Sequence, residues 1–237
     1  MVRNDHYTNM SKSQNKRATL PVLNLVPGGQ ADAPAAGRRQ RRAAETRLRL
    51  FRCALQLIAE RGFPSVTVED ITEAADVGKG TFFNYFATKD HVLGVMAEIQ
   101  LGKVRKAALL ASQGKQAIHE VLHRLMQRLA EEPGRSPDLA RALISSFLAS
   151  AGVRTIIVGR MLEGHKMIAE VVAAGQKRDE IDPRLNQEMV ATQLLQAVMG
   201  TILLWSTHGE PALKVWIEDS FQHFWRAIAL PGPEKKP

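Results

Sequence analysis

Residues 66–93, VTVEDITEAADVGKGTFFNYFATKDHVL, contain the pattern that decides the fold. Thr67 begins a capping box, because its hydroxyl is placed to accept a hydrogen bond from the backbone of the first helical turn. The helix that follows is short, and residues 76–78 form a tight turn before a second short helix over residues 79–86. Thr88 is then placed to cap a further helix. Two short helices joined by a tight turn indicate a helix-turn-helix within residues 67–86.

The second short helix has one apolar face and one polar face. Phe82 and Phe86 are four residues apart, so they share a face and anchor the helix in a core. The opposite side carries Lys79, Thr81, Phe83 and Asn84. These polar types bind bases and phosphates: Asn to adenine, Lys to guanine or phosphate, and Thr to phosphate or a thymine methyl. Gly80 leaves room for close approach of a phosphate. A buried aromatic hairpin is the alternative, but it would not display these polar side chains together.

Residues 45–93, and above all 66–93, resemble the DNA-binding domain of the tetracycline-repressor (TetR) family. The resemblance rests on the dense run G-T-aromatic-aromatic-x-Y-F-x-x-K at residues 80–89. It implies phosphate contacts for Thr67, Tyr85 and Lys89, and it places Lys79, Thr81 and Asn84 against an operator. Phe83 stands where the family often has Tyr, so this position keeps the apolar contact but lacks the hydroxyl. Gly78 replaces the common Ser or Ala. The second short helix, which is the recognition helix of the motif, is therefore expected to lack a side-chain cap.

The positive charge is concentrated near the N-terminus. Residues 1–49 hold ten Lys or Arg against three Asp or Glu, so +7 of the net +8 lies there. Such a concentration beside one module indicates a polyanion-binding end. Residues 1–37 lack periodicity and are predicted to be a disordered basic extension, for which a merely solubilising tail is the alternative. The arginines that follow are predicted to form an arm that reaches a minor groove or phosphates: Arg38, Arg39, Arg41 and Arg42. Arg47 is a further predicted DNA-binding residue.

The rest of the chain is predicted to be all-α. The first helix has apolar residues at three- and four-residue spacing from Leu48 and ends at Gly62. Later helices are expected at residues 116–131, 138–150, 154–174, 183–208 and 212–229. The pattern predicts an N-terminal three-helix helix-turn-helix domain and a C-terminal helical bundle, about nine helices together. The family resemblance implies that this bundle is the ligand-binding and dimerisation domain. The predicted boundaries are 1–37 for the extension, 38–90 for the DNA-binding domain, 91–230 for the bundle and 231–237 for a tail.

The bundle is expected to hold a dimer interface and a ligand pocket. The last two helices are apolar over more than one face, and the family resemblance implies a four-helix dimer interface there, with Leu194, Val198, Ile202, Trp216, Phe221 and Phe224 as candidates. A Met-rich and aromatic lining suits an apolar small-molecule effector. The pocket candidates are Phe147, Met161, His165, Met199 and Trp205, each of which is also compatible with a simple core position.

Residues 119–123, HEVLH, match a zinc-hydrolase motif on a predicted helix. The motif lacks a third ligand at the usual spacing, and Arg124 would oppose a dication. A chance match is therefore preferred to catalysis, with a regulatory metal site formed with His165 as an intermediate possibility. We expect no cofactor, no catalytic residue and no metal, so the chain is predicted not to be an enzyme.

Composition limits the remaining classes of protein. The single cysteine, Cys53, excludes an internal disulfide and a cysteine-based zinc finger. No signal peptide and no uninterrupted apolar run long enough for a membrane span is evident, so a cytoplasmic, nucleoid-associated protein is expected. The predicted function is a ligand-responsive repressor that binds a palindromic DNA operator as a homodimer. The alternatives are a metal-dependent hydrolase or metal-responsive protein that uses the HEVLH segment, and a non-specific nucleoid-binding protein.

Overall fold

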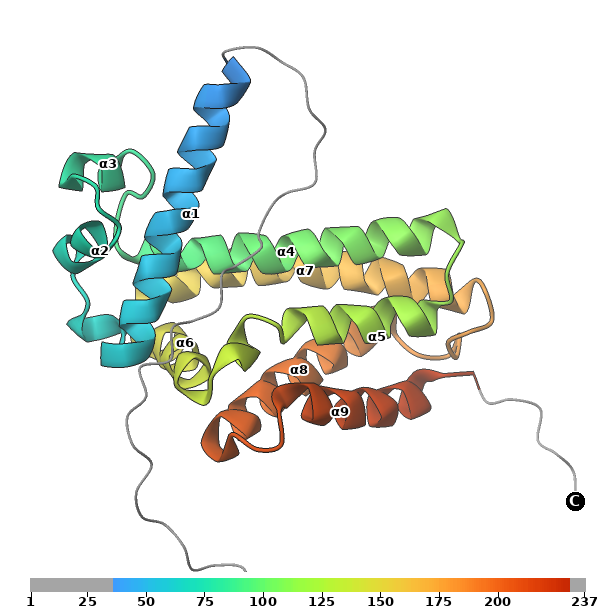
Figure 1. Cartoon of the computed structure of the whole chain (residues 1–237). Helices are drawn as coiled ribbons and strands as arrows, with labels where there is room; N and C mark the ends of the chain where they lie inside the picture. Colours follow the sequence, from blue (N-terminus) through green and yellow to red (C-terminus); the bar gives the residue numbers. More distant parts are fainter. Residues whose placement is uncertain (1–35, 231–237) are drawn as a thin grey trace, which may run out of the picture.

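A computed structural model describes residues 36–230, which fold into helices connected by short loops (Figure 1). The predicted extension at 1–37, except its last two residues, and the predicted tail at 231–237 lie outside the described residues. The elements are α1 (Ala36–Arg61), η1 (Phe63–Ser65), α2 (Val68–Ala74), α3 (Lys79–Phe83), α4 (Asp90–Gln113), α5 (Ile118–Leu129), η2 (Pro133–Arg135), α6 (Pro137–Ala149), α7 (Ala151–Gln176), α8 (Gln187–His208) and α9 (Leu213–Ile228). Within residues 36–230 there is no β-strand, only an isolated bridge, which confirms the all-α prediction.

Helix α1 follows its apolar spacing and ends where the sequence predicts. Phe51, Leu55 and Ile58 are buried on one face of the helix. Gly62 has a φ of 78°, a left-handed conformation that suits glycine and stops the helix directly after Arg61. A 3-10 turn, η1, then redirects the chain into α2. The first helix is therefore held by burial of one face and ended by a backbone conformation.

The core consists of two clusters of buried side chains. One cluster joins α1, α2, α3 and the start of α4, and it also includes Leu139 of α6 and Val153 of α7. The other cluster fills the bundle between α4 and α9. Figure 1 shows α4 and α7 side by side along the molecule, with α1, α2 and α3 at one end. Helices of the bundle thus complete the core of the helix-turn-helix end.

The predicted helix over residues 183–208 begins later, at Gln187. Asn186 is its N-cap, and the side chain of Asn186 accepts a hydrogen bond from the backbone N–H of Met189 at 3.0 Å. The residues before it form a turn in which the Asp182 carboxylate accepts bonds from the backbone N–H of Arg184 at 2.9 Å and from its Nε at 3.0 Å. Hydrogen bonds from Arg184 lower the pKa of Asp182 to about 2. The local turn therefore replaces the first helical turn expected from the sequence.

Helix α8 is unusually apolar on both sides. By length and composition it is the only single helix among residues 36–230 that meets the requirement for a membrane span, and the bent pair α6–α7 meets it only when taken as one segment. Core helices of globular proteins pass the same test. Of the most apolar window of α8, 39% is buried inside the protomer, so a large part of this apolar helix lies on the surface.

Candidate nucleic-acid interface and ligand cavity

The N-terminus of α2 is closed by the predicted capping box. The backbone N–H of Asp70 donates to the Thr67 hydroxyl at 3.1 Å, and the Asp70 carboxylate accepts from the backbone N–H of Thr67 at 2.8 Å. The Thr67 hydroxyl also donates to Asp70 Oδ2 at 2.6 Å. This reciprocal pair fixes where α2 starts. The predicted phosphate contact of Thr67 would use an exposed side chain at this position.

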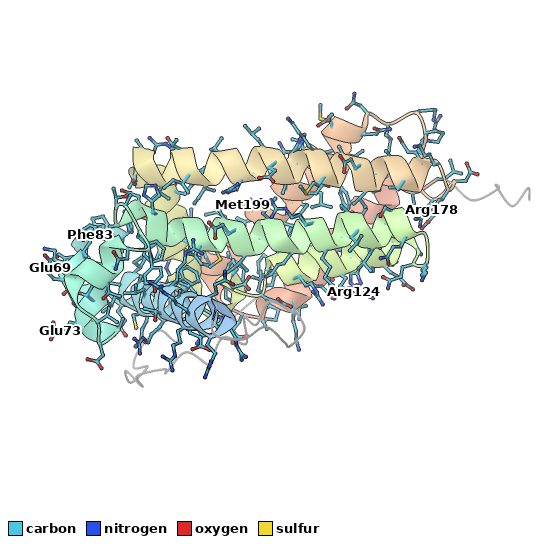
Figure 2. All side chains as sticks on the ribbon, turned by 90° about the horizontal axis from the view of Figure 1, so that it is seen from above. Glu69, Glu73, Phe83, Arg124, Arg178 and Met199 are labelled. Carbon is cyan, nitrogen blue, oxygen red and sulfur yellow. The ribbon has the colours of Figure 1, made fainter. Side chains whose placement is uncertain are left out.

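Two aromatic rings anchor α3 as the spacing predicts. Phe82 is fully buried, Phe86 is almost fully buried, and their ring centroids are 5.3 Å apart. Phe83, the adjacent residue, is 50% exposed, with its ring edge-on to Phe82 at 5.4 Å. Because Phe82 is locked in the core, the opposite side of α3 is held toward solvent. Figure 2 shows Phe83 at the end of the molecule opposite Arg178.

The other predicted DNA contacts surround Phe83. Lys79, Gly80 and Asn84 are exposed and Thr81 is half-buried. No described atom lies within 4 Å of the position a Cβ would take at Gly80, so the surface there is open. The regular part of α3 ends at Phe83 rather than at residue 86, yet Phe86 still donates its N–H to the Phe82 carbonyl at 2.9 Å. Gly78 is the N-cap, and no described side chain caps α3.

Glu69 of α2 is a charged neighbour of this face that was not predicted from the sequence. Its carboxylate pairs with the Lys79 ammonium across the turn, and both side chains are more than half exposed. The hydrogen bond from Lys79 holds the pKa of Glu69 below its usual value. The ten-residue separation carries no signal in a single sequence, because the pair depends on how tightly the turn folds α3 back on α2. Figure 2 shows Glu69 at the same end as Phe83.

Three other predicted DNA-binding residues lie beside this face, and two of them already have partners. Lys89 Nζ donates to the carbonyls of Phe63 and Val66 at 2.8 and 2.7 Å. Arg47 forms a two-pronged ion pair with Glu98 of α4, at 2.9 and 3.1 Å. Tyr85 is half-buried. Lys89 and Arg47 therefore brace α1, η1 and α4 against one another in this structure, and their predicted phosphate contacts remain predictions.

The start of α4 differs from the expected cap. Lys89 is the N-cap residue, and no described side chain caps the helix. The Thr88 hydroxyl instead lies 2.8 Å from His91 Nδ1. Thr88 therefore sits one position too early to cap α4.

The predicted arginine arm is wrong in its conformation. Arg38, Arg39, Arg41 and Arg42 lie inside α1 and not before it. All four are exposed, and Figure 1 shows the first turns of α1 extending beyond the bundle. A helix of about 10 Å diameter is too wide to follow the floor of a minor groove of about 6 Å as an extended arm does. These side chains are thus presented along a helical rod.

A cavity of about 190 Å³ lies within the bundle. It is lined by residues of α4, α6, α7 and α8, together with Leu129 of α5 and Pro133 of η2. Among the predicted pocket residues, Phe147, Met161 and Met199 line it. Only two of the lining residues, Gln100 of α4 and Arg160 of α7, have polar side chains. Neither was evident from the sequence, because a lone Gln or Arg on a long helix looks like an ordinary surface residue.

The other two predicted pocket residues lie elsewhere. His165 Nε2 lies 2.9 Å from Thr192 Oγ1 of α8, and its Nδ1 lies 3.0 Å from the Glu188 carboxylate. Trp205 is buried, and its indole N–H donates to the Pro211 carbonyl at 3.0 Å. Both side chains therefore join loops and helices of the bundle and do not line the cavity.

The predicted dimer-interface residues are mostly core residues of one protomer. Leu194, Val198, Ile202, Phe221 and Phe224 are buried within the bundle, and Trp216 packs against the same cluster. A side chain enclosed by its own chain has no surface to offer a partner. The large exposed apolar residues of α8 and α9 are different ones: Met189, Met199, Leu203, Leu204 and Val215.

The HEVLH segment lies on α5 and faces α9. His119 packs edge-on against Trp225, with centroids 4.9 Å apart, and the His123 ring lies 4.7 Å from Phe221. His123 Nε2 is 2.5 Å from the Glu218 carboxylate. Within residues 36–230, no three His, Cys, Asp or Glu side chains are grouped so as to hold a metal ion. The two histidines thus act as packing and hydrogen-bonding groups between α5 and α9.

Comparison with known proteins places this geometry in a family. Residues 50–96 match the family model described as "Bacterial regulatory proteins, tetR family". The chain is 30% identical over 160 residues to the HTH-type transcriptional regulator TcmR of Streptomyces glaucescens, covering 54% of this chain and 70% of that protein. It is 25% identical over 175 residues to the HTH-type transcriptional repressor KstR of Mycolicibacterium smegmatis, covering 72% and 81%.

Solved structures agree with this assignment. FadR of Thermus thermophilus, a TetR-family transcriptional repressor solved with lauroyl-CoA, aligns with a TM-score of 0.59 and 25% identity, over 81% of this chain and 99% of that one. FadR of Bacillus halodurans, at 17% identity, shares the fold with a TM-score of 0.65, over 88% of this chain and all of that one. The chain therefore belongs to the tetR family of bacterial regulatory proteins, as a ligand-responsive DNA-binding transcription regulator.

Proposed function

We propose that this chain is a transcriptional repressor that binds a palindromic operator as a homodimer and is released by a small, largely apolar effector. The recognition surface is the exposed side of α3, with Lys79, Thr81, Phe83 and Asn84 toward the bases. Thr67 and Tyr85 contact phosphates at its edges. Such a regulator acts on chromosomal DNA, so it works in the cytoplasm in association with the nucleoid.

The observation that carries the proposal is the shared wall between the cavity and the helix-turn-helix core. Leu93 and Met96 of α4 line the cavity, and they also belong to the buried cluster that holds α1, α2 and α3. Leu143 and Ile157 line the cavity and pack against that same cluster. A ligand that enlarges the cavity must therefore move side chains of the same buried cluster that holds Phe82 of the recognition helix. Close-packed cores transmit such displacements.

The effect of the ligand follows from linkage. A ligand that binds one arrangement of the two recognition helices more tightly shifts the population toward that arrangement. Operator affinity then changes by the same coupling free energy, about 1–3 kcal/mol in typical cases. The lauroyl-CoA bound by the T. thermophilus relative suggests that an acyl group is one kind of apolar effector such a cavity accepts.

We place the dimer interface on the exposed apolar face of α8, next to α9. Met189, Leu203 and Leu204 lie on this face and are each about half exposed or more. A neighbouring glycine, Gly200, has no described atom within 4 Å of its Cβ position, so a partner helix has room to approach. The inner face of α8 is buried within its own chain, and its outer face is also apolar. Packing against α8 of a partner subunit would bury this outer face.

Selection of bound fragments from the source genome tests the proposal. The full-length protein is incubated with fragmented genomic DNA, bound fragments are sequenced, and protection is mapped on the enriched site. A repressor predicts a palindrome with two protected half-sites and a stoichiometry of two chains per site. Uniform recovery of fragments without a shared palindrome contradicts the proposal and favours a nucleoid-coating protein.

A further inference from the structure

Two polar side chains line the cavity, Gln100 and Arg160. Gln100 has a buried oxygen without a hydrogen-bond partner among the described residues, and Arg160 shares its one carboxylate partner with a second cation. Gln100 Nε2 donates to the Leu129 carbonyl at 3.1 Å and to Glu132 Oε2 at 3.3 Å. These two acceptors fix the orientation of the amide, because the nitrogen must face them. Gln100 Oε1 is buried and has no hydrogen-bond partner among the described residues.

A buried acceptor without a partner costs roughly 1–3 kcal/mol, so this position calls for a donor. An ordered water does not fit at this position, because a buried water needs about two to four polar partners. The remaining cavity wall near Gln100 is apolar: it includes Met96, Leu101 and Val104 of the same helix. A hydroxyl or N–H group on a bound molecule would satisfy the amide oxygen.

Arg160 makes the other polar contribution, at the rim of the cavity. Its guanidinium bonds Glu163 at 3.2 Å, and Arg105 bonds the other oxygen of the same carboxylate at 2.6 Å. Two cations therefore share one anion, which leaves a net positive charge at this place. Arg160 lines the cavity and its side chain is 47% exposed, so its charge is reachable from solvent. Guanidinium groups carry five donors and bind carboxylates and phosphates well.

We infer that the effector is an anionic amphipath: an apolar body that fills the cavity, a hydrogen-bond donor that meets Gln100 Oε1, and a negatively charged group at Arg160. This inference rests on the proposed function, since it describes the ligand of that same cavity. Gln100 sets the orientation of the ligand and Arg160 selects its charge. A purely apolar molecule of the same size leaves both groups unsatisfied.

Matched probes test the role of Gln100. The affinities of the full-length protein for decanoate and 10-hydroxydecanoate are measured by calorimetry, together with those of Gln100→Met and, if that variant does not fold, Gln100→Leu. The wild type is expected to bind the hydroxy acid at least as tightly as decanoate. The variant is expected to shift this preference about tenfold toward decanoate, because the hydroxyl loses its partner. An unchanged ratio overturns the inference. Gln113→Met, exposed on the same helix and outside the cavity, is the control and should leave the ratio as in the wild type.

The charge at the rim is tested with Arg160→Gln. This variant is expected to bind decanoate about tenfold more weakly and decanol as before. Equal weakening for the acid and the alcohol contradicts the role of Arg160. If the wild type binds none of these probes but still binds its selected operator, the ligand class is wrong and the regulator stands. If operator binding itself fails, the proposed function is wrong.

Discussion

Asn84 is the residue for which the proposed base reading is most specific. It is exposed at the end of α3, two positions from the buried ring of Phe82. Asn84→Ala is expected to weaken operator binding by about 1–3 kcal/mol, because alanine cannot form the bidentate hydrogen bonds to one base. Fluorescence anisotropy on the selected operator and on random DNA measures the effect. Binding to random DNA should barely change, and equal weakening on both DNAs would refute base reading. Glu73→Gln, exposed on α2, is the control.

Asp182 provides a pH-dependent prediction away from the DNA. Arg184 lowers the folded-state pKa of Asp182 to about 2, below its value of about 3.9 in an unfolded chain. The ion pair therefore adds stability at neutral pH, and this contribution is lost as pH falls below about 4 and through 2. Asp182→Asn should lower the urea midpoint at pH 7, with a difference that narrows toward pH 3. A difference that stays constant with pH would show that the charge is irrelevant. Asp219→Asn, exposed on α9, is the control.

Individual residues were predictable where a local pattern determines them. The four-residue spacing of Phe82 and Phe86 and the capping pattern at Thr67 are properties of one short segment, and the structure has both. Leu194 and Phe221 could not be assigned in this way. An apolar helix sequence indicates that the helix is buried. Whether its own chain or a partner buries each face depends on how helices far apart in the sequence pack. Gln100 was missed for the same reason.

The arginines of α1 make a prediction about an element. Four exposed arginines on the first turns of α1 form a basic rod at the helix-turn-helix end of the molecule. Replacing Arg38, Arg39, Arg41 and Arg42 by Gln should weaken binding to every DNA sequence about equally. The slope of log K against log salt should become shallower by about 0.9 for each phosphate that the rod no longer neutralises. Titrations at several salt concentrations measure this. Unchanged affinity and slope would show that the rod does not touch DNA.

At the level of elements, stop signals were more reliable than start signals. Gly62 ends α1 where expected, because a positive φ is available to glycine at no steric cost. Starts were less regular: Thr67 caps α2 as predicted, whereas α8 begins at Gln187 rather than at residue 183. Helix starts depend on side-chain caps, and an Asp or Asn in a turn competes for the same backbone groups. The turn at Asp182 is such a case.

The dimer is a property of the whole molecule. If the exposed side of α8 is the interface, Leu203→Asp combined with Leu204→Asp should give a monomer, because two desolvated charges would lie in an apolar contact. Sedimentation velocity measures the mass, and operator affinity should drop with it. Leu109→Asp on α4, also exposed, is the matched control and should remain dimeric. A double variant that stays dimeric would place the interface elsewhere.

The proposed regulation depends on one step: filling the cavity releases the operator. A single variant tests this step without knowledge of the effector. Gly164 of α7 lines the cavity, and a Cβ there would make only ordinary contacts, 3.7 Å from Leu101 and 3.8 Å from Val104. Gly164→Ala is therefore a mild control, whereas Gly164→Leu places a side chain in the ligand's space. Operator affinity of the full-length protein is measured by fluorescence anisotropy for both variants, with folding and dimer mass checked. Gly164→Leu is expected to bind the operator about tenfold or more weakly than Gly164→Ala, in line with a coupling of about 1–3 kcal/mol. Equal operator affinity in the two folded, dimeric variants would contradict release by filling of the cavity.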